Sequence, residues 1–184
     1  IENEEPPFVP VYDESGEPPY LCEWLDADTG SDSVGLTTLS MIASSLQLFL
    51  NDWVRLRLEH RTDYRYKRKD AQGWFNAYKK IFRKIGLALD ECSADWDLIE
   101  QAILARNRGQ HPEFISSIHT THSRSDLDKF PSPYFSTDDF RKEADGDSEK
   151  SSWWLSPKVF VDVDKLIRLE HEIENLCSWL QESY

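Results

Sequence analysis

The sequence predicts an all-α protein, a four- to five-helix up-and-down bundle with an irregular acidic N-terminal arm and a long loop before the last helix. Three observations favour this fold. Apolar residues recur at three- and four-residue intervals in several segments, the alternation typical of strands is almost absent, and most prolines lie outside those segments. The chain has 184 residues, which is long enough for one domain with its own core.

The N-terminal arm is predicted over residues 1–32, where five prolines break any long helix and ten acidic residues stand without a lysine or arginine. The first amphipathic helix follows over residues 33–62, as its apolar spacing indicates. Asp32 or Ser33 is its expected N-cap, because short polar side chains accept hydrogen bonds from the first free backbone N–H groups. Residues 33–184 make up the predicted bundle domain.

Two shorter helices are predicted in the middle of the chain. The first covers residues 74–85 and stops at Gly86, since glycine adopts the left-handed conformation that ends many helices. The second begins after Ser93, which is a good N-cap, and ends near Arg108. It ends there because Gly109 is expected to leave the helix in the same left-handed conformation.

A long connection precedes the last helix. Residues 123–157 contain prolines and a charged polar run, so they are predicted to form a long, partly mobile loop. A weakly alternating stretch over 158–163 is predicted to be short and extended, and residues 162–182 to form the last helix. The predicted core consists of Leu46, Phe49, Leu50, Trp53, Ile81, Phe82, Ile99, Ile103, Leu169, Ile173 and Leu176.

Basic residues are concentrated in the middle of an acidic chain. The net charge is −13, but residues 34–84 hold eleven of the 21 lysines and arginines against four acidic residues. Aromatic side chains interrupt this basic stretch, and charge combined with aromatic rings suits single-stranded RNA. We expect a positive surface near Arg106 that binds RNA; the alternative is a solvated helix face. The candidate RNA-binding residues of the stretch are Arg65, Lys67, Arg68, Lys69, Lys79, Lys80 and Arg83.

The most distinctive motif is Arg-Asn-Arg-Gly-Gln-His at residues 106–111. On an unbroken helix Arg106 and His111 would point about 140° apart. If Gly109 ends the helix, the chain reverses and the imidazole can return to the guanidinium, with Asn107 beside them. An arginine that holds a phosphate and a histidine that moves a proton suit a phosphodiester-cleaving site. The alternative is a helix end whose basic residues only complement the helix dipole.

This motif lies between an apolar helix and a terminal helix, and it resembles the hallmark of the HEPN family. That hallmark is an arginine, a polar residue that is often asparagine, a few spacers and a histidine at the end of an inner helix. The resemblance implies a helical bundle and, as in many members, a metal-independent ribonuclease that acts as a toxin or in phage defence. It also implies a homodimer in which two motifs face one another. Glu113 stands where variants silenced by nucleotide transfer carry a tyrosine, so that control is not expected.

The resemblance implies a role for each residue of the motif. His111 would take the proton of the ribose 2′-hydroxyl, and Arg106 would neutralise charge that builds up on the phosphate oxygens. Asn107 would orient Arg106 or His111, and Arg108 would add a phosphate contact to the RNA. The products would be a 2′,3′-cyclic phosphate and a 5′-hydroxyl, formed without a metal or other cofactor.

A zinc site and a catalytically silent binding module are the alternatives to catalysis at the motif. His119 and His122 stand three residues apart, a spacing seen in zinc sites, but no further ligand has a matching offset, so no metal is expected and both are predicted to be exposed loop histidines. A catalytically silent helical module is the second hypothesis. It would bind a protein partner, such as a cognate antitoxin or a regulatory protein, through the acidic arm or the basic face.

Cysteine use and hydropathy bear on the location of the protein. The three cysteines are widely spaced and form no CxxC pair, which predicts a reducing, cytoplasmic location. No uninterrupted apolar run reaches the roughly 18 residues that a membrane span needs. The sequence therefore predicts no membrane contact.

Overall fold

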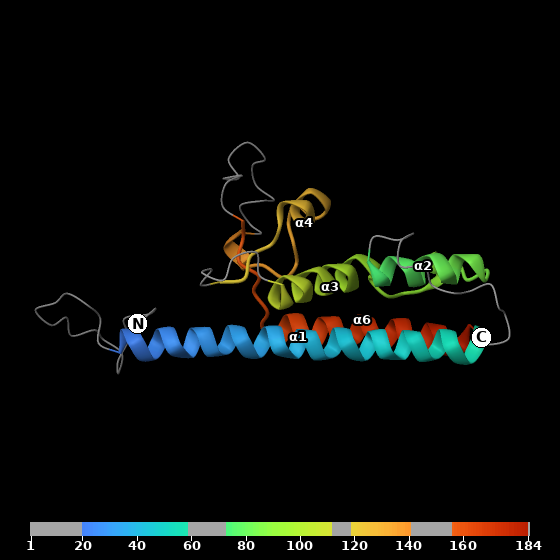
Figure 1. Cartoon of the computed structure of the whole chain (residues 1–184), viewed down its shortest axis with the longest axis horizontal. Coiled ribbons are helices and arrows are strands. Elements are labelled where there is room, and N and C mark those ends of the chain that lie inside the picture. Colours follow the sequence, from blue (N-terminus) through green and yellow to red (C-terminus); the bar gives the residue numbers. More distant parts are fainter. Residues whose placement is uncertain (1–19, 59–72, 112–118, 141–155, 184) are drawn as a thin grey trace, which may run out of the picture. The chain divides into compact units, whose positions relative to one another are not determined.

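The structure, a computed structural model, describes residues 20–58, 73–111, 119–140 and 156–183. Helices dominate these residues, and an isolated β-bridge is the strand-type pairing found among them. The predicted all-α class is therefore confirmed. The helices are α1 (Leu21–Leu58), α2 (Trp74–Lys84), α3 (Trp96–Gln110), α4 (Arg124–Lys129) and α6 (Val163–Glu182), with the 3₁₀ helix η2 (Leu89–Glu91) before α3 (Figure 1).

The chain is divided into two compact units, Ile1–Val34 and Gly35–Tyr184. In the first unit the described side chains are mostly exposed, Trp24 to 39% and Leu25 to 47%. The second unit contains the rest of α1, the other helices and the hydrophobic core. The core contacts between the helices lie within this second unit.

Helix α1 begins well before the predicted start at residue 33, because the prolines of the arm all precede Leu21. Thr29 and Ser33 donate their hydroxyl hydrogens to the carbonyls four residues earlier, each over 2.9 Å. Ser33 therefore lies inside the helix rather than at its N-cap. Residues 21–32, predicted to be irregular, are helical, and residues 1–19 of the predicted arm lie outside the described residues.

The second unit's part of α1 and helix α6 run alongside each other in the same direction. Near their C-terminal ends, Nε1 of Trp53 donates a hydrogen bond to the carbonyl of Leu180 (3.1 Å). At the other end, Gly35 lies against Val161, just before α6 begins. An up-and-down bundle alternates the direction of neighbouring helices, so this pair departs from the predicted arrangement.

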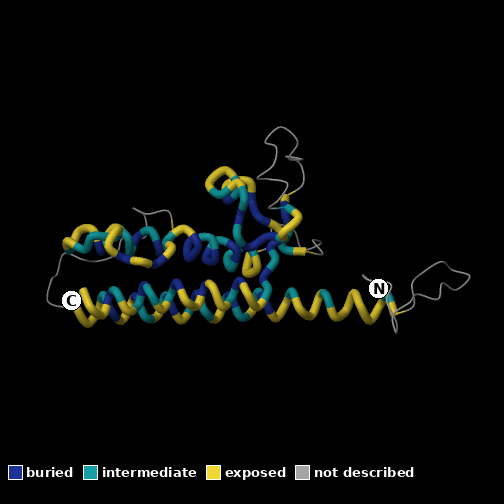
Figure 2. The backbone as a smooth tube through the Cα atoms, turned by 180° about the vertical axis from the view of Figure 1, so that it is seen from behind, coloured by how far each residue is buried: buried dark blue, intermediate teal, exposed yellow. Residues whose placement is uncertain are grey.

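Helix α3 runs in the opposite direction to both. Its first residue, Trp96, packs edge-on against Trp179 near the end of α6, with ring centroids 6.1 Å apart. Its last turn brings Gly109 close to Leu36 near the start of the second unit. Helices α2 and α3 lie end to end on the same side of α1 and α6, as Figures 1 and 2 show.

The core lies where α1, α2, α3 and α6 turn their apolar faces toward one another (Figure 2). Aromatic rings connect three of these helices: Phe82 of α2 packs edge-on against Trp53 of α1 at 5.6 Å and against Trp179 of α6 at 6.4 Å. The predicted core is confirmed, because all of its residues are buried except the half-buried Phe49, Ile81 and Ile173.

The boundaries of α2 and α6 agree with the prediction. Helix α2 ends at Lys84, and Gly86 has a φ of +92°, the left-handed conformation expected at this stop. Helix α6 begins at Val163, where the side chain of Asp162 accepts a hydrogen bond from the N–H of Lys165 (2.8 Å). The glycine signal was thus correct for the end of α2, and the apolar spacing was correct for the extent of α6.

The extended piece predicted over residues 158–163 is confirmed in part. Lys158 forms the antiparallel bridge with Thr121, and the N–H of Val159 donates to the carbonyl of Thr120 (2.8 Å). Val159 and Val161 are buried in the core. The chain therefore passes through the bundle in extended form before α6 starts.

Part of the predicted loop over 123–157 is ordered instead. Ser123 and Asp126 form a capping box: Oγ of Ser123 accepts from the N–H of Asp126 (3.2 Å), and the Asp126 carboxylate accepts from the N–H of Ser123 (3.3 Å). This box starts α4, which has only six residues and no apolar period, so hydrophobic spacing did not reveal it. Phe135 further along is fully buried.

By length and composition alone, α1 is a candidate membrane span, and 28% of its most apolar stretch is buried. Core helices of soluble proteins satisfy the same criterion. In α1, Leu39, Leu46 and Leu50 are buried in the core of the bundle. The expectation that the chain contacts no membrane stays a prediction.

Candidate functional site at the end of helix α3

Helix α3 carries the predicted catalytic motif near its C-terminal end and buries one face of its preceding turns in the core. Its N-cap is Asp95, whose Oδ1 accepts hydrogen bonds from the N–H groups of Asp97 (3.1 Å) and Leu98 (2.9 Å). The predicted cap, Ser93, is not used, because the carboxylate of Asp95 also complements the positive end of the helix dipole. The buried residues of α3 are Leu98, Ile99, Glu100, Ala102, Ile103 and Ala105.

The helix does not break at Gly109. It continues to Gln110, and the N–H of His111 still donates to the carbonyl of Asn107 (3.0 Å). Gly109 is not among the described residues with positive φ, so the predicted left-handed reversal is wrong. A Cβ at Gly109 would meet the Leu36 side chain at 3.4 Å, an ordinary van der Waals distance, so neither the backbone conformation nor the packing requires glycine here.

The motif is organised around Asn107. Nη1 of Arg106 donates a hydrogen bond to Oδ1 of Asn107 over 3.1 Å. His111 follows Asn107 by one helical turn, so the two residues lie on the same face of the helix end. Asn107 therefore stands between the arginine and the histidine that were expected to meet directly.

Arg106 and His111 differ in their surroundings. Arg106 is half-buried, and its Nε is shielded from solvent without a hydrogen-bond partner among the described residues. His111 is exposed at the C-cap position. The helix end therefore presents the accessible imidazole of His111 five residues after the partly shielded guanidinium of Arg106.

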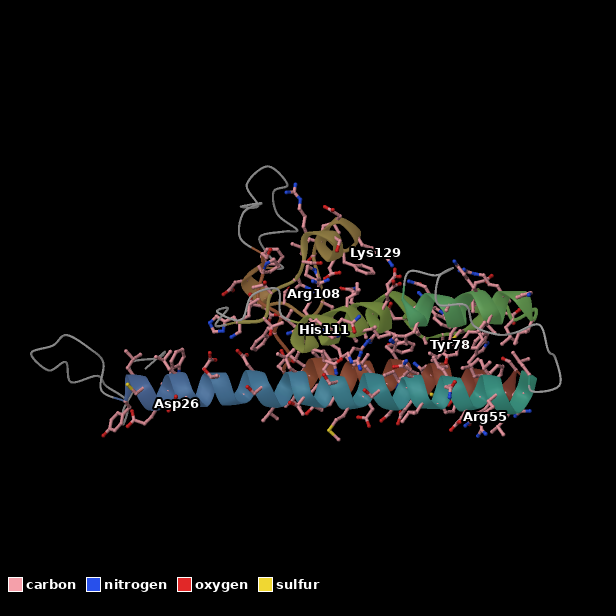
Figure 3. All side chains as sticks on the ribbon, in the orientation of Figure 1. Asp26, Arg55, Tyr78, Arg108, His111 and Lys129 are labelled. Carbon is pink, nitrogen blue, oxygen red and sulfur yellow. The ribbon has the colours of Figure 1, made fainter. Side chains whose placement is uncertain are left out.

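Arg108 forms an ion pair with a buried carboxylate. Its Nε lies 2.9 Å from Oδ2 of Asp126 in α4, an ion pair in which the Nε–H is not aligned for a hydrogen bond, and the Asp126 side chain is only 8% exposed. Arg108 and His111 lie at the same end of α3, as Figure 3 shows. The phosphate contact predicted for Arg108 thus faces a competing anion.

The basic residues of α2 lie away from the motif. Phe75 packs against Trp96 with ring centroids 5.8 Å apart, and Asn76 donates to Glu100 over 2.8 Å, so α2 meets the first turns of α3. The motif occupies the other end of α3. For the described residues the expected positive surface near Arg106 is therefore wrong, because a short connection places α2 and α3 end to end.

The predicted RNA-binding residues fall into two groups. Lys79 pairs with Glu100 over 3.2 Å and lies over the ring of Phe75 at 4.9 Å, so its charge is engaged in the fold. Lys80 and Arg83 are exposed on α2. The residues that lie outside the described ranges are Arg65, Lys67, Arg68 and Lys69.

Glu100 is a buried carboxylate that sequence reasoning missed. It accepts hydrogen bonds from Asn76 and Lys129 and pairs with Lys79. Burial alone would raise the pKa of Glu100, but the hydrogen bonds from Lys129 and Asn76 and the charge of Lys79 outweigh it and hold the pKa below its usual value. An acidic residue on the apolar face of a predicted helix was the available signal.

His122 is buried rather than exposed as predicted. Its Nε2–H donates to the carbonyl of Phe135 over 2.9 Å. Burial lowers the pKa of His122, and the charge of Arg108 acts in the same direction, against that of Asp126. Among the described residues no group of three or more metal-ligating side chains comes together.

Comparison with known proteins finds no matching family model, no curated relative and no matching solved structure. The resemblance to the HEPN family therefore stands on residues 106–111 and on the order of the helices.

Proposed function

We propose that this chain is a metal-independent endoribonuclease of the kind used as a toxin or in phage defence. The observation that carries the proposal is the side-chain set at the end of α3, where Asn107 holds Arg106 by a hydrogen bond and His111 follows one turn later. An accessible imidazole can move protons and a guanidinium can stabilise charge on a phosphate in a metal-free attack, and the carboxamide can position the guanidinium.

In the proposed reaction His111 acts as the general base. It takes the proton from a ribose 2′-hydroxyl, and the freed oxygen attacks the adjacent phosphorus. The P–O5′ bond breaks, which leaves a 2′,3′-cyclic phosphate and a 5′-oxygen that receives a proton. The general base is a neutral imidazole and the general acid is a protonated one, so one His111 cannot be both in the same step. The proposal therefore includes a homodimer whose second His111 acts as the acid.

Arg106 stabilises the transition state in this scheme. The Asn107 carbonyl oxygen accepts from Nη1 and leaves the other terminal nitrogen of Arg106 for the non-bridging phosphate oxygens. Asn107 is thus a positioning residue for Arg106. Lys80 and Arg83, exposed on α2, would contact phosphates elsewhere along the RNA.

A matched pair of motifs tests the proposal. Arg106→Ala and His111→Ala should each abolish cleavage of a single-stranded RNA and the formation of 2′,3′-cyclic ends. Arg55→Ala and His60→Ala, which have the same spacing, should not. Cleavage should persist with a chelator. Cleavage that survives His111→Ala, or that a chelator stops, contradicts the proposal.

Exposed apolar residues on α1 favour the second candidate, a catalytically silent interaction module. Met41 and Leu48, one heptad apart, are 67% and 66% exposed on the face opposite the core. A growth assay separates the two functions. Expression of the wild type should arrest a bacterial host and His111→Ala should not, whereas equal growth favours the interaction module.

A further inference from the structure

Arg108 and Asp126 form an ion pair between two helices that the sequence did not connect. Nε of Arg108 lies 2.9 Å from Oδ2 of Asp126, with the two side chains 25% and 8% exposed. A pair this shielded from water attracts more strongly than one on the surface. Arg108 therefore offers little net positive charge to an approaching anion.

Asp126 is held in place independently of Arg108. Its carboxylate accepts the N–H of Ser123 in the capping box of α4, and its own N–H donates to Oγ of Ser123. The carboxylate is thus anchored by the backbone of α4, and moving it away from Arg108 would open the first turn of that helix.

Two more polar contacts fasten the segment around α4 to α3. Lys129 pairs with Glu100, and Oε1 of Gln101 accepts from the N–H of Tyr134 over 2.7 Å. Asp126 therefore faces the end of α3 from a segment with several attachments. These attachments keep Asp126 in contact with Arg108.

We propose that Asp126 is an internal anion that masks Arg108 and keeps it from binding phosphate beside the Arg106–His111 site. The inference deepens the proposed function, since the masked cation adjoins the proposed RNA site. A phosphate that approaches Arg108 must displace a shielded carboxylate or accept its repulsion. RNA affinity is therefore set below what the arginines of α3 could supply.

Charge-neutralising variants with a matched control test this inference. Asp126→Asn removes the charge, and its side-chain oxygen can still accept the N–H of Ser123, so α4 keeps its cap. Asp128→Asn makes the same change in net charge at an exposed position of the same helix. The ligands are a 2′-O-methyl RNA oligonucleotide, which cannot be cleaved by 2′-hydroxyl attack, and immobilised heparin.

Asp126→Asn should tighten RNA binding about tenfold at low salt, because a charged hydrogen bond is gained. Its salt slope should steepen by about 0.7, as expected for one more contact to a single strand. Arg108→Gln added to Asp126→Asn should remove both gains. Thermal unfolding of each variant establishes that it is folded.

The outcomes separate this inference from the proposed function. If the wild type binds RNA and Asp126→Asn behaves like Asp128→Asn, the masking is wrong and the RNA function stands. If no variant binds RNA but Asp126→Asn alone gains retention on heparin, the masking stands and the RNA function is wrong. Equal retention of all variants on heparin, without RNA binding, overturns both.

Discussion

At the scale of single residues, Gly35 sits where α1 passes directly beside the backbone of the segment leading into α6. A Cβ at this position would overlap the carbonyl oxygen of Val161, and a backbone atom cannot turn aside as a side chain can. Gly109 in α3 also lies in a helical conformation, but its nearest neighbour is the flexible side chain of Leu36. The two glycines therefore form a natural pair for comparison.

Gly35→Ala should lower the free energy of unfolding by about 1–3 kcal/mol through overpacking. Gly109→Ala should leave it unchanged or raise it by up to about 1 kcal/mol, because alanine is the better helix former. Urea unfolding followed by circular dichroism measures both. Severe destabilisation by Gly109→Ala would contradict the continuous helix through this position.

His122 should make the stability of the protein sensitive to acid. Burial lowers its pKa in the folded state, so the unfolded chain binds the proton more readily. Stability from this group is fully present above the ordinary histidine pKa of about 6.5 and is lost as the pH falls through the folded value. His122→Gln should flatten this part of the profile, measured as the urea midpoint between pH 7.5 and 5. His119→Gln, at an exposed position, is the control, and an equal effect there would refute the assignment.

At the scale of elements, the helices with an apolar period were predictable, whereas one helix start and one short helix were not. Helix α6 followed from its apolar spacing, and the end of α2 from Gly86. The start of α1 was missed because Ser33 looks like a cap in sequence, yet its hydroxyl bonds back into the preceding turn. Helix α4 was missed because six residues with a single apolar side chain, Leu127, have no period to detect.

Glu100 connects three elements, since it binds Asn76 and Lys79 of α2 and Lys129 of α4 from within α3. Glu100→Leu should lower the free energy of unfolding by about 3–5 kcal/mol, because it leaves the half-buried lysine Lys79 without its carboxylate. Asp128→Leu, an exposed change of the same kind on α4, should cost well under 1 kcal/mol. Calorimetric unfolding compares the two, and similar costs would mean that the Glu100 contacts do not hold the elements together.

At the scale of the whole molecule, the sequence predicted the helical class and the core but not how the helices are arranged. The directions of α1, α3 and α6 follow from distant contacts such as Trp53 with Leu180, which no local pattern encodes. The same holds for the candidate site. Its residue types were visible in the sequence, whereas the side-chain conformation that joins Arg106 to Asn107 and the ion pair of Arg108 with Asp126 are visible only in the folded structure.

The proposed homodimer predicts the size of the particle in solution. Sedimentation equilibrium should give twice the chain mass of 21.5 kDa at concentrations where cleavage is measured. Cleavage per chain should fall on dilution below the dissociation constant, because a lone site lacks its acid. Full activity from a 21.5 kDa monomer would rule out the two-histidine scheme.

The parallel contact of α1 with α6 has a consequence for how the protein is made. Trp53 and Leu180 are separated by 127 residues, so the apolar face of α1 that holds Leu39, Leu46 and Leu50 is only partly covered until α6 has left the ribosome. A nascent chain that ends before α6 exposes this apolar face to chaperones and proteases. Synthesis of α6, rather than of any earlier helix, is therefore the event that allows the core to close.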